Sequence, residues 1–187
     1  GMMVDIYARR AMRNTSKRSR AMYQVRRKTL SNSTTTTTGE KTMTTFKPFQ
    51  HFGTCIHATH RLEDLFPSFI ELLKELEKGG SLKISEEFEN HPERDNELLD
   101  SLMQHLNEYA PNYCYFGTHE GDGSDFGFWV DHFAIEEDIE SGELLSVSDL
   151  AEIPTKHVGD VLLVNDHGNM SLYFIGKDGV SHERWAI

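Results

Sequence analysis

The sequence has little cysteine and no long apolar run, and each absence excludes a class of protein. Cys55 and Cys114 are its only two cysteines. Two thiols cannot form a disulfide framework, so we expect a protein of the reducing cytoplasm. No apolar run approaches the roughly 20 residues that a membrane-spanning helix needs, so no membrane partner is expected. No apolar core follows the N-terminal basic residues, which argues against a secretory signal.

The common catalytic and phosphate-binding motifs are also absent. The chain has neither a G-x-x-x-x-G-K-[ST] loop nor a G-x-G-x-x-G at a strand–helix junction. It has no G-x-S-x-G, no H-E-x-x-H and no paired C-x-x-C. We therefore predict no cofactor and assign no catalytic residue, and enzymatic activity is left as the less favoured alternative.

Charge divides the chain into two unlike parts. Residues 1–50 contain 11 Lys or Arg and 2 Asp or Glu, a net charge of +9. Residues 51–187 contain 8 Lys or Arg and 28 Asp or Glu, a net charge of −20, together with all ten histidines. Such asymmetry is typical of a tail attached to a folded body. The acidic body is not expected to bind the polyanionic backbone of nucleic acids.

The first part, residues 1–46, is predicted to be a basic, low-complexity N-terminal arm. Its basic residues crowd positions 9–28, and a Ser/Thr tract with five consecutive threonines follows over residues 31–39. Three interpretations stay open. The arm is a polybasic tail that binds nucleic acid or lipid headgroups, a transit peptide, or a non-native extension upstream of a natural start at Met43.

The acidic body, residues 47–187, is predicted to be a single α+β domain. Apolar residues recur at helical spacing over residues 62–78 and 92–109, which predicts two long helices. Pro67 should lie in the first turn of the first helix or mark a break in it. Residues 136–140 read as a loop or short exposed helix, and residues 146–153 as a turn of helix. Strands are expected over residues 52–60, 81–88, 112–118, 125–130, 160–164, 171–175 and 180–187. These elements favour an antiparallel or mixed sheet of five to six strands with both helices packed on one face.

The segment between Tyr113 and Trp129 predicts a β-hairpin with a polar tip. His119, Glu120, Asp122 and Asp125 lie at this tip, where they serve either as ordinary turn residues or as ligands of a cation or partner. Gly121 and Gly123 are explained by turn geometry, since positive φ is cheap only for glycine. Asp166 and His167 occupy a second predicted turn and join Trp129 as candidate contacts for a partner.

A metal site is the alternative use of the histidines. Cys55, His57, His119, His132 and His167 are the candidate ligands, because zinc is bound by thiolate and imidazole groups. The spacing matches no standard metal motif, so buried cysteine and surface histidines are the competing interpretation.

The aromatic residues around the hairpin are dense enough to form a binding surface. Alternation along the strands divides them between a core face and a second face that can bind a protein. They are Tyr113, Tyr115, Phe116, Phe126, Phe128, Trp129 and Phe133.

The body resembles small uncharacterised proteins carried by bacterial phages and plasmids. The matching residues are Phe116–Trp129 (FGTHEGDGSDFGFW) and Val164–Tyr173 (VNDHGNMSLY). The resemblance covers most of the body and none of the arm. It implies a bacterial, mobile-element setting and transfers no catalytic residue.

Three functional hypotheses follow from the sequence. The first is a non-enzymatic acidic domain that binds a basic protein, as an inhibitor or immunity protein would. The second is a metal-binding domain or metal-dependent enzyme that uses His and Asp residues at strand ends. The third is nucleic-acid binding through the basic arm alone.

Overall fold

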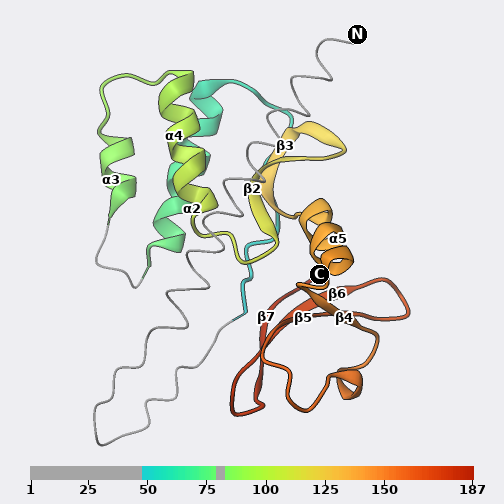
Figure 1. Cartoon of the computed structure of the whole chain (residues 1–187). Helices are drawn as coiled ribbons and strands as arrows, with labels where there is room; N and C mark the ends of the chain where they lie inside the picture. Colours follow the sequence, from blue (N-terminus) through green and yellow to red (C-terminus); the bar gives the residue numbers. More distant parts are fainter. Residues whose placement is uncertain (1–47, 79–82) are drawn as a thin grey trace, which may run out of the picture. The chain divides into compact units, whose positions relative to one another are not determined.

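A computed structural model describes residues 48–78 and 83–187, which belong to one compact unit, Phe46–Ile187. The fold of these residues is α+β, with four α-helices and two separate β-sheets of three and four strands (Figure 1). The basic arm and the predictions made for it lie outside the described residues, as do residues 79–82.

Two amphipathic helices cover the first sheet. Helix α2 (Leu62–Leu76) and helix α4 (Asn96–Asn107) contact each other, and α2 also contacts β1 while α4 contacts β2 (Figure 1). Each helix buries the apolar stripe that its spacing predicts. The fully buried residues of the two helices include Leu65, Phe66, Phe69, Leu73, Leu102 and Leu106.

Both helices differ in detail from the prediction. Helix α4 begins at Asn96 rather than at Pro92, because the Asp95 side chain accepts a 2.8 Å hydrogen bond from the Leu98 amide and caps the helix there. Helix α2 continues through Pro67, which is exposed in its second turn. The prediction that Pro67 lies in the first turn or breaks the helix is therefore wrong.

The first sheet has the order β1-β3-β2 and is antiparallel throughout. Its strands are β1 (Gly53–Ile56), β2 (Cys114–His119) and β3 (Asp122–Val130). Phe116 pairs with Phe128 across β2 and β3, and both rings are buried against the helices. The predicted hairpin is confirmed, and its strands extend further toward the turn than residues 118 and 125.

Helix α5 (His132–Ser141) connects the hairpin to the second sheet. The Asp131 side chain accepts a hydrogen bond of 3.0 Å from the Ala134 amide and caps the helix start. Gly142 ends the helix with a φ of +77°, a conformation that favours glycine. The acidic residues that the sequence assigned to a loop or short helix are thus part of a full helix.

The second sheet has the order β4-β5-β6-β7. Strand β4 (Leu145–Val147) pairs parallel with β5 (Gly159–Val164), and β6 (Met170–Ile175) and β7 (Ser181–Ala186) follow as an antiparallel meander. A short 3-10 helix, η1 (Leu150–Glu152), lies between β4 and β5. The turn of helix predicted over residues 146–153 is thus a 3-10 helix over residues 150–152, and the first two residues of that range belong to β4.

Trp185 of β7 joins the two sheets. Its side chain is fully buried in the same apolar cluster as Phe128, and its Nε1–H donates to the Asn112 carbonyl at 2.9 Å. Asn112 precedes β2 and donates from Nδ2 to Asp160 of β5 at 2.9 Å. These contacts connect elements that lie far apart in the sequence.

The α+β class is confirmed, whereas the prediction of one sheet of five to six strands is wrong. The strands divide between two sheets, in which β1 pairs with β3 and β4 pairs with β5. Alternation of apolar and polar residues along one strand does not specify which strand it pairs with. The predicted strand over residues 81–88 is also wrong where the structure describes it. Helix α3 (Ile84–Glu89) forms there, and the Glu77 carboxylate accepts hydrogen bonds from the backbone and hydroxyl of Ser85 at its start.

Candidate functional site

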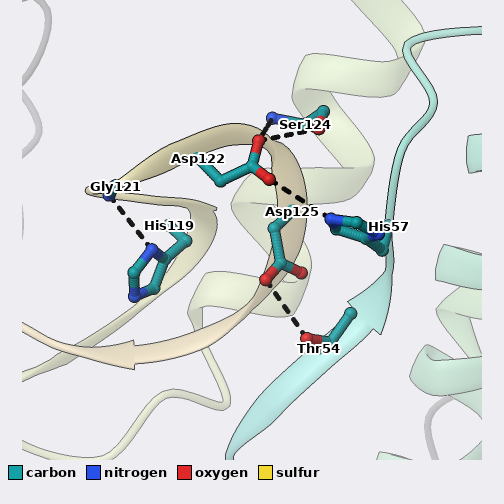
Figure 2. A network of polar contacts seen from close by, with 7 residues as sticks. All are labelled: Thr54, His57, His119, Gly121, Asp122, Ser124 and Asp125. Carbon is teal, nitrogen blue, oxygen red and sulfur yellow. Dashed lines mark hydrogen bonds and ion pairs between the residues drawn. The ribbon is translucent and has the colours of Figure 1, made fainter.

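The tip of the β2–β3 hairpin gathers polar side chains from two parts of the chain (Figure 2). His119 pairs with Asp122 across a two-residue turn formed by Glu120 and Gly121. Strand β1 lies antiparallel beside β3, so the residues around its end reach the tip from the other side. His57 and Thr54 thereby meet the carboxylates of β3.

Asp122 is the centre of this network. Its Oδ1 accepts hydrogen bonds from the amide and the hydroxyl of Ser124, at 2.9 and 2.7 Å, and its Oδ2 lies 3.2 Å from His57 Nε2. Hydrogen bonds from Ser124, followed by the one from His57, lower the pKa of Asp122 to about 2. The carboxylate is therefore charged across the physiological pH range.

The neighbouring Asp125 is held differently. Its Oδ2 accepts a 3.2 Å hydrogen bond from the Thr54 hydroxyl. Its Oδ1 is buried and has no hydrogen-bond partner among the described residues. Figure 2 shows Asp122 and Asp125 side by side on β3, directed toward β1.

The network does not have the arrangement of a nucleophile and its base. The Ser124 hydroxyl donates to Asp122, not to His57, and a carboxylate whose pKa is lowered to about 2 is a poor base for a hydroxyl proton. The side chains of His57 and Asp122 are 57% and 46% exposed, and so the pair interacts in water-like surroundings. The arrangement stabilises the hairpin tip against β1 and supplies surface charge.

His119 belongs to the opposite side of the hairpin. Its ring packs edge-on against Trp129 with centroids 4.6 Å apart, and its Nδ1 accepts a 3.0 Å hydrogen bond from the Gly121 amide. Figure 2 shows it turned away from Asp122 and His57. Gly121 and Gly123 do not have positive φ, so the explanation of these two glycines by turn geometry is wrong. Glu120 is exposed at the turn.

The other predicted site residues lie elsewhere. Asp166 and His167 are exposed in the β5–β6 turn, where the His167 amide donates to the Asn165 side chain at 2.9 Å. His132 is the exposed first residue of α5. Cys55 directs its thiol toward the Ser68 carbonyl oxygen, 3.9 Å away. The candidate metal ligands thus occupy different elements.

Within residues 48–78 and 83–187, no group of three or more His, Cys, Asp or Glu side chains is arranged to hold a metal ion. The metal hypothesis stays a prediction, and elemental analysis of the purified protein tests it directly.

Two residues of the hairpin network were not identified from the sequence. Ser124 and Thr54 act only through contacts with Asp122 and Asp125, and Thr54 is 71 positions from its partner. The local sequence Asp-Gly-Ser-Asp at positions 122–125 is the one signal that could have predicted a contact between Ser124 and a neighbouring aspartate.

A long acidic segment dominates the surface charge. Residues 95–155, which form α4, the hairpin, α5, β4 and η1, contain 15 Asp or Glu and no Lys or Arg. Of the eight Lys and Arg after position 50, at least four already form ion pairs with carboxylates of the same body. They are Arg61, Lys74, Lys78 and Lys83. The negative charge of residues 95–155 is therefore not neutralised by basic residues within that segment.

Helix α5 presents this charge beside an exposed aromatic ring. Phe133 is 63% exposed, and Glu136 and Glu140 are exposed on the same helix. Residues three and seven positions apart share one face of a helix. Ile135 and Asp138 form the buried face, and Tyr113 donates to the Asp138 carboxylate at 2.9 Å. The outer face of α5 thus combines an apolar ring with carboxylates.

Comparison with known proteins gives no match to any protein-family model, any curated protein or any solved structure. In the part of the chain that the structure describes, no helix is both long enough and apolar enough to cross a membrane.

Proposed function

We propose that the domain binds a basic protein through its acidic surface, with the outer face of α5 as the docking site. The observation that carries the proposal is the segment of residues 95–155, with 15 acidic residues and no Lys or Arg. A surface of one sign attracts an oppositely charged partner over the Debye length, about 8 Å at physiological salt, and repels wrong partners.

The exposed ring of Phe133 supports a protein partner rather than a small cation. A largely exposed aromatic side chain on a charged helix has little to contact in the free domain. Aromatic residues are enriched among the few side chains that contribute most of the binding energy at protein interfaces. Carboxylates around such a ring suit a partner that surrounds an apolar pocket with Lys or Arg.

An inhibitor or immunity role is the specific form of this proposal. The acidic face would occupy the basic cleft of a nucleic-acid enzyme and compete with its polyanionic substrate. A phage or plasmid setting, as expected from the sequence of Phe116–Trp129, would agree with such a role.

The test is affinity capture with the full chain at low and high salt. We expect a basic protein to be captured at about 50 mM salt and released as the ionic strength rises, because charge steering is screened. The double variant Glu136→Lys/Glu140→Lys and the single variant Phe133→Ala should each lose most of the captured partner.

Matched controls separate the α5 face from overall charge. Glu87→Lys/Glu93→Lys makes the same charge change at two exposed positions outside residues 95–155, and Val180→Ala removes an exposed apolar side chain elsewhere. Both should retain the partner. A chain that captures no basic protein at low salt, or α5 variants that behave as the controls do, would contradict the proposal.

A further inference from the structure

One edge of the first sheet is open in the part of the chain that the structure describes. Among these residues, β1 pairs only with β3, so its other edge has no neighbouring strand. The opposite edge of the sheet is covered. There, the Phe116 amide donates to the Asn107 side chain at 2.8 Å, and the Cys114 amide donates to the Pro111 carbonyl at 3.1 Å.

The second sheet also has a covered edge. The Phe49 amide donates to the carbonyl oxygen of Arg184 in β7 at 2.8 Å, so the chain that leads into β1 covers part of that strand. Proteins usually cover, charge or distort the edges of their sheets, because an exposed row of backbone donors and acceptors is a template for another strand. The contrast makes the edge of β1 a specific feature of this fold.

A groove follows the open edge. It has a volume of about 460 Å³ and lies between residues 51–55 on one side and helix α2 on the other. Phe52 and Leu72 contribute its apolar surface, and Ser68, Glu71 and Glu75 contribute its polar surface on the helix. Gly53, Thr54 and Cys55 of β1 therefore border this groove.

The chemistry of this groove favours a basic segment. Glu71 and Glu75 are exposed one turn apart on α2, and no Lys or Arg is among the described residues that line the groove. Lys78 lies 3.6 Å from Glu75, but both side chains are largely solvent-exposed, and such pairs contribute little. Four residues of helix rise about 6 Å, close to the two-residue repeat of an extended strand, ~6.6–6.8 Å. Basic side chains at alternate positions of a strand therefore match this spacing of carboxylates.

We infer that the groove between β1 and α2 binds an extended, basic peptide segment of a partner protein, which adds as a strand to the free edge of β1. The partner's backbone would pair with residues 52–55, and alternate side chains would contact Leu72 and the carboxylates of Glu71 and Glu75. This mode of recognition obtains affinity from main-chain hydrogen bonds and selectivity from alternate side chains. The inference rests on the basic partner of the proposed function and assigns it a second contact, separate from α5.

A synthetic peptide tests the inference with the full chain. The probe has seven residues, with arginine at its second and fourth positions, valine at its sixth and threonine elsewhere, and it carries a fluorophore for anisotropy. We expect a Kd of about 0.1 mM or tighter at low salt. Glu71→Gln/Glu75→Gln should weaken binding at least tenfold, whereas Glu136→Gln/Glu140→Gln should change it less than threefold.

Backbone methylation distinguishes strand addition from simple charge attraction. In a paired strand, alternate amides face the neighbouring strand and the remaining ones face away. Of two probes N-methylated on alternate residues, one should bind at least tenfold more weakly and the other nearly as well as the unmodified peptide. Amide hydrogen exchange should slow at residues 52–56 when the unmodified peptide binds.

The inference is overturned if the peptide does not bind at low salt. It is also overturned if both methylated probes lose affinity equally, or if hydrogen exchange slows outside residues 52–56. Slow exchange of the β1 amides without peptide would also overturn it, because the edge would already be occupied. The occupant would be a second copy of the chain if the protection rises with protein concentration, and the chain's own arm if it does not. A partner captured through α5 by a chain that ignores the peptide leaves the proposed function intact. Peptide binding without any captured partner supports the groove and contradicts that function.

Discussion

Gly127 of β3 lies directly against the backbone of Gly53 in β1. A Cβ atom at Gly127 would come within 2.8 Å of the Gly53 carbonyl carbon and closer still to its oxygen. Thr54 is the register partner of Gly127, and its hydroxyl reaches Asp125. This close approach therefore sets the distance between β1 and the hairpin, on which both the network at the tip and the groove beside β1 depend.

Gly127→Ala should separate β1 from β3. Because the obstructing atoms belong to the backbone and cannot rotate away, we expect a loss of about 1–3 kcal/mol in the free energy of unfolding, as for other overpacked positions. Urea denaturation measures this loss, and hydrogen exchange should show faster opening of residues 53–56. Gly123→Ala in the same strand is the control, since a Cβ added there would meet no described atom within 4 Å. An equal loss at both positions would contradict the steric explanation.

Ser124→Ala should raise the pKa of Asp122. Hydrogen bonds from Ser124 are the largest cause of its depression from the ordinary value of 3.8 to about 2. Since the folded-state pKa is lowered, the stabilisation is present above about pH 4 and is lost as the pH falls through about 2. The variant should lose less stability than the wild type across this acid range. Carboxyl carbon NMR titration of Asp122 gives the measurement.

Ser148→Ala provides a matched comparison for that titration. Ser148 donates to Glu152 from its amide and its hydroxyl, both at 3.0 Å, and these bonds lower the pKa of Glu152. The variant should raise the pKa of Glu152 and leave that of Asp122 unchanged. A shift of Asp122 in this variant would mean that its pKa responds to something other than its direct donors.

Cys55 should react slowly with alkylating reagents. Burial, with a smaller contribution from the charge of Glu75, raises its pKa from 9.0 to about 11. Because the thiolate is the reactive form, this higher pKa should slow alkylation at pH 8 by about 100-fold relative to a small-molecule thiol. Mass spectrometry after timed iodoacetamide treatment follows the reaction. Glu75→Gln should accelerate it only modestly, since burial is the main cause, and a rate near that of a free thiol would contradict the prediction.

Trp185→Phe should weaken the connection between the two sheets. The indole is fully buried, and its Nε1–H is the donor to the Asn112 carbonyl. We expect a loss of about 1–3 kcal/mol, because the carbonyl loses its partner and the smaller ring leaves space. Thermal and urea unfolding measure it. Trp129→Phe also removes a hydrogen bond from an indole, which donates to the Gly117 carbonyl at 3.0 Å. Because Trp129 is only half-buried, this variant should lose less stability. The reverse order would contradict the role given to Trp185.

The candidate site was predictable only in part from the sequence. Asp122 and Asp125 could be assigned to the hairpin tip because turn residues and alternating aromatics mark that hairpin locally. Their partners could not be assigned, since His57 and Thr54 reach them only through the pairing of β1 with β3. Asp166 and His167 have the same local signature as the tip residues, yet they occupy a turn of the other sheet. Polar residues in the sequence identify a turn, but not the segments that contact it in the fold.

The sequence by itself determined the α+β class, the presence of two long amphipathic helices, the hairpin and the charge asymmetry, because each depends on residues close together in the chain. Only the tertiary structure decided that the strands form two sheets, that the described residues leave one edge of β1 unpaired beside α2, and that Phe133 is exposed among carboxylates. Strand pairing and burial depend on which distant segments pack together in the apolar interior. Periodicity along the chain reports only local residue spacing and does not specify these contacts.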